Sequence, residues 1–282
     1  MARSSPLYSV KGNSCITQTA VSNSNRNKTA PYDDVAITVD FPWTLRLYND
    51  PTWPIDRPES VRCGRDHMIH APSTEVLKVG AGDTITFAHH LWDPVDWRSA
   101  QFVDCPQGRG TCDDEGYTMS LYHDGPVVAH LSKVPEGQDV QTYDGSGEWV
   151  KIYSLGVRTR GEGDFSGTPW IWAPRNDGKL PPKFQFAVPP QTPAGQYRAV
   201  MKDNNTLYTQ MYPSCAQIQI ESDVVGNMLP KGIRIPEDMS PNSPGMMATE
   251  DMRYGRAIDE GYIYPGGLLW DGEKLVVDEP KY

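Results

Sequence analysis

Ala216-Gln217-Ile218-Gln219-Ile220 is the stretch that decides the fold class, because apolar and polar residues alternate along it one by one. Successive side chains of a β-strand point to opposite faces of a sheet, so this alternation predicts a strand with one buried and one exposed face. Thr84–His89 and Phe184–Val188 carry the same pattern. No segment shows a sustained helical period, so strands are the expected elements.

Three further segments extend the pattern, namely Val127–Leu131, Trp149–Tyr153 and Tyr197–Met201. Turn-forming stretches such as Gly80-Ala-Gly-Asp83 and Pro189–Gly195 separate the expected strands. Several short alternating strands with irregular connections are typical of a β-sandwich. The sequence therefore predicts an all-β fold.

The chain is expected to form one domain with an unusual segment at each end. Residues 1–30 are polar and lack an apolar period, which indicates a disordered segment or an incorrect gene start. Residues 31–282 form the expected β-sandwich domain. From about residue 225 the chain is rich in Pro and Gly but keeps apolar residues, which predicts an extended tail that wraps the sandwich.

The charge and hydropathy of the chain limit the classes of partner that we expect. The 282 residues have a formal net charge of -10, and no cluster of Lys and Arg breaks this acidity. We therefore expect neither a nucleic acid nor an anionic membrane as the partner. No window approaches the roughly 18 uninterrupted apolar residues of a membrane span, and the first residues show no signal-peptide pattern.

The cysteines and two sequons favour an extracellular route. Cys105 and Cys112 are spaced for a small disulfide-closed loop, which leaves Cys63 and Cys215 as a candidate long-range pair and Cys15 without a partner. The sequons begin at Asn27 and Asn204 and are candidate glycosylation sites. This expectation of secretion conflicts with the lack of a visible signal peptide.

One histidine stands in a context that suits a metal or catalytic site. Tyr122-His123-Asp124-Gly125-Pro126 leads into an apolar strand, so His123 is expected at the rim of a sheet. An isolated histidine is more often a surface or core group than a ligand. Partners elsewhere in the chain are needed to favour a metal site.

Eight short motifs follow one another in an order that resembles the fungal lytic polysaccharide monooxygenases of auxiliary activity family 9, formerly glycoside hydrolase family 61. The match covers roughly residues 40–270. The motifs are Asn49-Asp-Pro, Cys63, Gly80–Phe87, His123–Val127, Gly145–Ile152, Pro193–Tyr197, Gln210–Gln217 and the Ile-Pro and Pro-Gly pairs of the tail.

The resemblance implies a secreted, immunoglobulin/fibronectin-III-like β-sandwich with long loops and a flat binding face. It implies one copper ion that uses O2 or H2O2 and an external reductant to oxidise a C–H bond in cellulose or another β-glucan. Imidazole nitrogens suit copper, and a planar surface suits a crystalline polymer. We also expect a monomer.

The same resemblance assigns roles to individual residues. His123 matches an imidazole ligand of copper, Tyr212 the axial tyrosine, and Gln210 a hydrogen-bond donor beside the metal. Cys63 and Cys215 match the long disulfide of the family. Without these neighbours, Tyr212 would more often be a core tyrosine and Gln210 a solvated strand residue.

The tail carries aromatic residues with two possible roles. Tyr262, Tyr264 and Trp270 match the region that supplies flat aromatic contacts to glucan rings in the family, and anchoring the tail is the equal alternative. The remaining histidines are interpreted as surface groups or satisfied core groups. They are His67, His70, His89, His90 and His130.

Two departures from the family favour a second hypothesis. The family holds copper chiefly through an amino-terminal histidine, whereas the first histidine here is His67. The family also has a histidine between Tyr197 and Gln210, where this chain has none. The chain is then either a monooxygenase with an incorrect gene start or a copper-free, non-catalytic polysaccharide-binding or structural member. A glycoside hydrolase would need two facing carboxylates, and no spacing pairs Asp124, Glu148 and Asp164.

Overall fold

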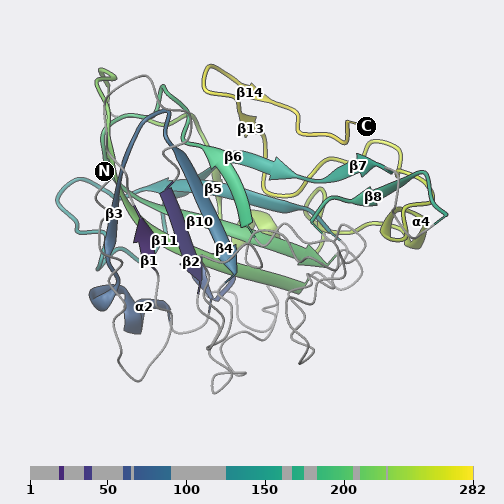
Figure 1. Cartoon of the computed structure of the whole chain (residues 1–282), viewed down its shortest axis with the longest axis horizontal. Helices are drawn as coiled ribbons and strands as arrows, with labels where there is room; N and C mark the ends of the chain where they lie inside the picture. The colour runs from purple at the N-terminus through teal and green to yellow at the C-terminus, as the bar shows by residue number, and fades with distance from the viewer. Residues whose placement is uncertain are drawn as a thin grey trace, which may run out of the picture.

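Strands dominate the computed structural model of the chain (Figure 1). The structure describes residues 19–21, 35–39, 60–64, 67–89, 125–160, 167–174, 183–205, 210–226 and 228–281. Strands of the two main sheets up to residue 221 are β1 (Thr19–Val21), β2 (Val35–Val39), β3 (Val76–Gly80), β4 (Thr84–His89), β5 (Val127–Lys133), β6 (Glu148–Leu155), β9 (Lys183–Ala187), β10 (Gly195–Asn205) and β11 (Gln210–Glu221). β7 (Val157–Thr159) and β8 (Trp170–Trp172) pair with each other in a separate two-stranded sheet. Short helices are α1 (Ser60–Cys63), α2 (His67–His70) and η2 (Ala71–Ser73).

Two sheets form the sandwich, with the small sheet in front of the large one in Figure 1. The small sheet has the order β1-β2-β4-β9. The large sheet has the order β14-β13-β6-β5-β10-β11-β3, in which β13 is Leu269–Trp270 and β14 is Leu275–Val276. β5, β6, β10 and β11 pair in antiparallel fashion, whereas β3 runs parallel to β11. The expected all-β, immunoglobulin-like sandwich is confirmed.

The main core lies between the two sheets. Alternate residues of the large sheet, such as Ala129, Tyr197 and Ile218, are fully buried against Ile85 and Phe186 of the small sheet. Tyr153 of β6 stacks on Phe186 with ring centroids 5.3 Å apart. The alternation of apolar residues therefore positions the strands as expected.

The second face of the large sheet is also covered, and here the prediction of half-exposed strands is wrong. Five polar residues on this face are buried, namely His130, Ser132, Lys151, Arg198 and Gln217. Each contacts a segment that covers the sheet. Ser132 Oγ lies 2.7 Å from the Tyr143 hydroxyl, and Gln217 Nε2 donates to the Ala71 carbonyl at 2.9 Å. Buried polar groups are retained where such partners satisfy them.

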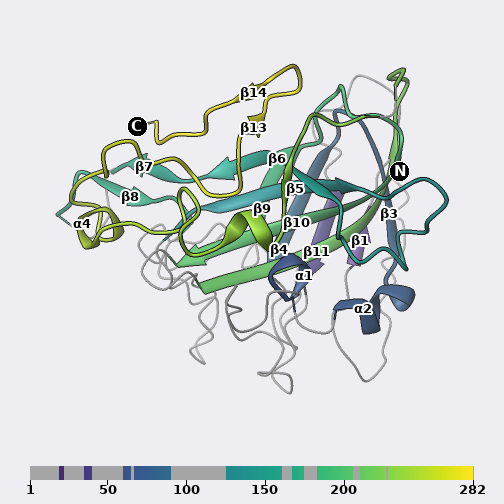
Figure 2. The ribbon, with the colours of Figure 1, turned by 180° about the vertical axis from the view of Figure 1, so that it is seen from behind.

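The tail supplies much of this cover. Its elements are β12 (Ile233–Arg234), η4 (Glu237–Met239), α4 (Glu250–Arg253), β13 (Leu269–Trp270) and β14 (Leu275–Val276). Figures 1 and 2 show the yellow tail running beside β6, β7 and β8 from both sides. β13 pairs with β6, and β12 pairs with Trp149 and Glu148 of the same strand. The tail is thus part of the packed structure.

Three consecutive carbonyls of the tail are held by side chains of the large sheet. Lys151 Nζ donates to the carbonyls of Tyr264 and Pro265, each at 3.1 Å, and His130 Nε2 lies 2.9 Å from the Gly266 carbonyl. Lys151 also pairs with Asp278 at 2.8 Å. His130 is therefore a buried core group that contacts the tail.

Two expectations about the whole chain can be compared with the described residues alone. Within the described ranges, no helix is long and apolar enough to cross a membrane. Of residues 1–30, the structure describes Thr19–Val21, which form β1 and pair with β2. The proposed boundary at residue 30 stays a prediction.

Candidate functional site at one end of the large sheet

Val127, the last residue of the His123–Val127 motif, and the start of the Gln210–Gln217 motif lie at the same end of the large sheet. Val127, the first residue of β5, is the register partner of Asp203 in β10, and Asp203 is in turn the partner of Tyr212 in β11. Val127 also pairs with Leu155, the last residue of β6. Tyr212 therefore lies at the same strand ends as the start of β5, directly after the His123 motif.

The neighbours of Tyr212 are set by the same ladder. Gln210 is the first residue of β11 and pairs with Asn205, the last residue of β10. Asp203 and Asn205 are thus the register partners of Tyr212 and Gln210, respectively. His123 itself lies outside the described residues, and so do Cys105, Cys112 and Asn27.

A disulfide fastens this strand to α1. Cys63 and Cys215 are bonded with their Cα atoms 5.1 Å apart, as the resemblance implied. Cys63 packs in a second apolar cluster with Val61, Trp149 and Met211, the residue just before Tyr212. The disulfide and this cluster therefore hold the start of β11, which contains Gln210 and Tyr212, against α1.

A buried cation lies beside the disulfide. The Arg198 side chain, whose residue is 2% exposed, donates from Nη1 to Cys63 Sγ at 3.7 Å and from Nη2 to Met68 Sδ at 3.7 Å and the Val140 carbonyl at 3.3 Å. Burial lowers the pKa of Arg198, and Tyr143 and Asp144 oppose this shift. Among the described residues, no carboxylate lies within ion-pair distance of Arg198.

His67 lies near the same cation. Its Nδ1 is 3.1 Å from the Gly64 carbonyl, and its buried Nε2 has no hydrogen-bond partner within the described structure. Burial lowers the pKa of His67 below its ordinary value, and the positive charges of Arg198 and Arg62 lower it further. A neutral imidazole is thus the form that this environment favours.

The tail aromatics are buried. Tyr262, Tyr264 and Trp270 are 8%, 5% and 5% exposed. The Val157 amide donates to the Tyr264 hydroxyl at 2.9 Å, and Tyr262 packs edge-on against Tyr264 and Trp172. These contacts favour the anchoring role over a flat glucan contact.

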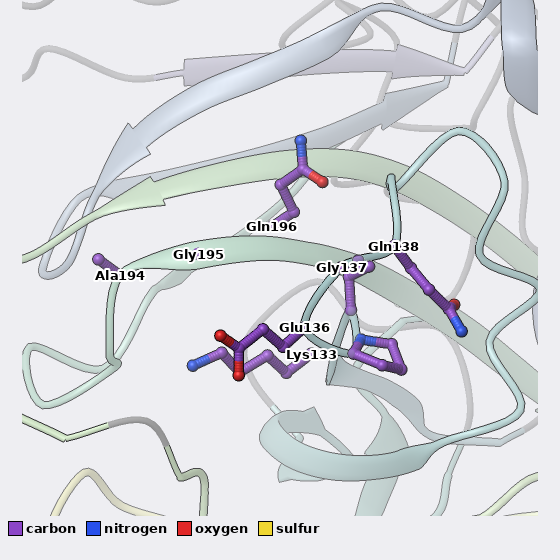
Figure 3. A pocket seen from close by; sticks show the side chains of 9 residues that line it. Lys133, Glu136, Gly137, Gln138, Ala194, Gly195 and Gln196 are labelled. Carbon is purple, nitrogen blue, oxygen red and sulfur yellow. The ribbon is translucent and has the colours of Figure 1, made fainter.

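A groove lies at the opposite end of the large sheet from Tyr212. Figure 3 shows Lys133 and Glu136 side by side along it, with Gln196 on the neighbouring strand β10. Its volume is about 570 Å³. It opens where β5 ends and β10 begins, so it is separate from the candidate site.

The chain matches the sequence profile of Auxiliary Activity family 9, formerly glycoside hydrolase family 61, over residues 15–255. The chain belongs to this family. The match begins inside the polar segment 1–30 and ends before the Tyr264–Gly266 carbonyls and Asp278. The residues that fasten the end of the tail therefore lie beyond the family match.

Curated relatives of the chain carry the same family name. It is 30% identical over 223 residues to AA9 family lytic polysaccharide monooxygenase H of Malbranchea cinnamomea, a match that covers 76% of this chain and 85% of the relative. It is 24% identical over 238 residues to AA9 family lytic polysaccharide monooxygenase C of Emericella nidulans, which covers 82% and 83%.

Solved structures of family 9 share the fold. The crystal structure of HiLPMO9B superposes with a TM-score of 0.53 at 21% identity, over 79% of this chain and 84% of that chain. A cellulose-active polysaccharide monooxygenase from M. thermophila gives a TM-score of 0.53 at 19% identity, over 79% and 84%.

Lys151 and Arg198 are the residues of this family member that sequence reasoning missed. Each sits in an alternating strand at a position predicted to face solvent, and each is buried in a layer whose contacts span more than a hundred residues. A charged residue inside an otherwise apolar run such as Trp149-Val-Lys-Ile was the available signal. It does not distinguish a buried cation from a solvated one.

Proposed function

We propose that the chain is a copper-dependent lytic polysaccharide monooxygenase that oxidatively cleaves cellulose or related β-1,4-glucans at a flat surface. The observation that carries this proposal is that Tyr212 and Val127, the first residue of β5, both pair with Asp203 of β10. Membership of family 9 and the similarity to lytic polysaccharide monooxygenases support it. The family resemblance also supports secretion and a monomer.

The donor set for copper is incomplete. Copper(II) prefers imidazole nitrogens, and the assigned residues supply one imidazole, from His123, and one phenol, from Tyr212. Among the described residues, no three His, Cys, Asp or Glu side chains form a group that could hold a metal ion. These residues alone do not fit a copper centre with nitrogen ligands, so an amino-terminal histidine would have to complete it.

The role proposed for the scaffold can be stated without the metal. Backbone pairing of β5, β10 and β11 fixes the spacing of the strand ends. The Cys63–Cys215 disulfide additionally fastens β11 to α1. Gln210 and Tyr212 would then be presented at a fixed position beside the His123 motif. Rigid strands hold such groups more precisely than loops do.

A copper-free, polysaccharide-binding member of the family is the second candidate. Asp203 and Asn205 occupy the ladder positions opposite Tyr212 and Gln210, and the segment between Tyr197 and Gln210 contains no histidine. This difference lies far from the amino terminus, so a histidine added there would not remove it. Binding without oxidation is the behaviour expected of such a member.

The test is copper titration by calorimetry with electron paramagnetic resonance on two preparations. One is the chain that begins at Met1, and the other begins with a histidine placed directly before Cys15, where the family match begins. If the histidine-led form alone binds copper in a nitrogen-rich site, the monooxygenase is supported. A Tyr212→Phe variant of that form should change the spectrum while leaving binding to cellulose intact.

Product analysis separates the two candidates. The copper-loaded, histidine-led form with ascorbate and peroxide should release oxidised oligosaccharides from cellulose, detected by mass spectrometry. Binding to cellulose without copper uptake or oxidised products would instead support the binding member. Release of reducing sugars without copper or reductant would point to a hydrolase and against both.

A further inference from the structure

The two sulfurs of the Cys63–Cys215 disulfide lie in different electrostatic surroundings. Cys63 is 4% exposed and its Sγ accepts from the Arg198 guanidinium at 3.7 Å. The Cys215 Sγ lies 3.6 Å from the Arg62 carbonyl and the residue is only partly buried. A positive charge therefore faces one sulfur, and the other is the one closer to solvent.

The positive charge of Arg198 has no ionic partner among the described residues while the disulfide is intact. Its hydrogen bonds go to two neutral sulfurs and one carbonyl. Arg62, the next cation, is already paired with Asp144 at 3.8 Å. A thiolate formed at Cys63 would supply the missing negative charge, because a buried cation strongly favours a neighbouring anion.

We propose that the Cys63–Cys215 bond is a reducible switch, in which an external thiolate attacks Cys215 Sγ and Arg198 stabilises Cys63 as the leaving thiolate. The attacking sulfur bonds to Cys215 while the Cys63–Cys215 bond breaks, and the electron pair of that bond stays on Cys63. A second thiolate then attacks the external sulfur of the mixed disulfide. This releases Cys215 as a thiolate, oxidises two external thiols to a disulfide and adds two electrons to the protein.

The switch would act on the candidate site through β11. Cys215 and Tyr212 lie on the same strand, and Met211 packs in the apolar cluster that contains Cys63. Reduction removes the covalent link between α1 and β11 while the ladder with β10 remains. The effect expected is a loosened start of β11 in a chain that stays folded.

The first test locates the point of attack without any substitution. The folded chain is treated briefly with glutathione, quenched with acid and mapped by peptide mass spectrometry. We expect the glutathione adduct on Cys215 and a free thiol on Cys63. An adduct mainly on Cys63 would overturn the proposal, as would a bond that resists reduction until the chain unfolds.

The second test measures the reduction equilibrium in mixtures of reduced and oxidised dithiothreitol, with Cys63 and Cys215 read by their alkylated peptides. Arg198→Met should require at least about tenfold more reduced dithiothreitol for half reduction, because the thiolate loses its counter-charge. Arg198→Lys keeps the charge and should stay within about threefold of the parent. Equal midpoints for the parent and Arg198→Met would overturn the proposal.

Lys151→Met is the matched control, because it also removes a buried cation from the covered face of the large sheet but contacts the tail instead of the disulfide. It should leave the reduction midpoint within about threefold of the parent. A rise in Lys151→Met equal to that in Arg198→Met would assign the effect to general packing and overturn the proposal. Circular dichroism confirms that each variant is folded before the titration. If Arg198→Met does not fold, Arg198→Lys and the glutathione map carry the test.

Discussion

The ammonium of Lys151 lies 2.8 Å from the carboxylate of Asp278, and the two side chains are 0% and 7% exposed. An ion pair in the middle of β6 thus fastens residues near the end of the chain. Asp278 also accepts from the Ser154 hydroxyl at 2.9 Å, and its carbonyl accepts from the Tyr264 amide at 2.7 Å. One residue therefore joins the last segment to both the sheet and the preceding part of the tail.

Lys151→Met and Asp278→Asn should each lower the free energy of unfolding by about 3–5 kcal/mol, because each leaves a buried charge without its partner. Urea denaturation measures this loss. The double variant should cost less than the sum of the two, since it leaves neither charge behind. Arg256→Ala, which breaks the exposed Arg256–Asp251 pair, is the control and should cost about 0.5 kcal/mol or less. Equal losses at the two pairs would contradict the interpretation that the buried Lys151–Asp278 pair stabilises the fold.

Gly156→Ala should destabilise the fold by about 1–3 kcal/mol, because a Cβ at this position would overlap the Tyr264 ring. Tyr264 is held by its hydrogen bond to the Val157 amide and cannot easily move away. Gly167→Ala is the matched control, since a Cβ there meets no atom within 4 Å. Thermal denaturation compares them, and a similar loss in both variants would show that packing against Tyr264 is not the cause.

The sequence predicted the strands that pack against the small sheet and missed the second layer. Ala216–Ile220 was expected as a strand, and β11 extends back to Gln210 because Met211 is buried in the apolar cluster with Cys63. Alternation fixes which residues face the main core but not whether another segment covers the opposite face. Arg198 looks solvated in the sequence for this reason. The sequence did not predict α1 and α2, because helices of four residues are too short to show a helical period.

The candidate site was predictable only in part. The resemblance implied the Cys63–Cys215 bond, which the structure confirms. Gln210 and Tyr212 both lie in β11, and the roles assigned to them stay predictions. The assignment of His123 as a ligand stays a prediction. The burial of Tyr262 could not be derived locally, because it depends on how the tail returns to β7 and β8.

Acid should destabilise the chain partly through His67. Burial, together with Arg198 and Arg62, lowers the pKa of His67 in the folded state, so the unfolded chain binds the proton more readily. The corresponding stability is fully present above about pH 6.5 and is lost as the pH falls through the folded-state pKa. In His67→Gln, the free energy of unfolding measured with urea should fall less steeply between about pH 7.5 and 5.5, the range in which histidines titrate. An unchanged slope would exclude His67 as the titrating group.

Alkali should destabilise the chain through its buried tyrosines. Burial raises the pKa of Tyr264 to about 12, and burial likewise raises the pKa of Tyr262 and of Tyr197. Because the folded-state values exceed the unfolded value, this stability is complete below about pH 10 and is lost as the pH rises further. Tyrosinate absorbance should therefore rise in two phases, the second coinciding with unfolding. In Tyr264→Phe the alkaline loss of stability should be shallower, and a single phase in the parent would contradict the prediction.

The double cover of the large sheet separates the residues that set stability from the residues that are free to vary. Among the described residues, the small sheet packs on one broad face of β5, β10 and β11, and α1, Tyr143 and the tail contact the other. Substitutions at the ends of these strands would leave the covered pairing between them intact. The strand ends are therefore where the sequence of this chain can change at the least cost to its folding.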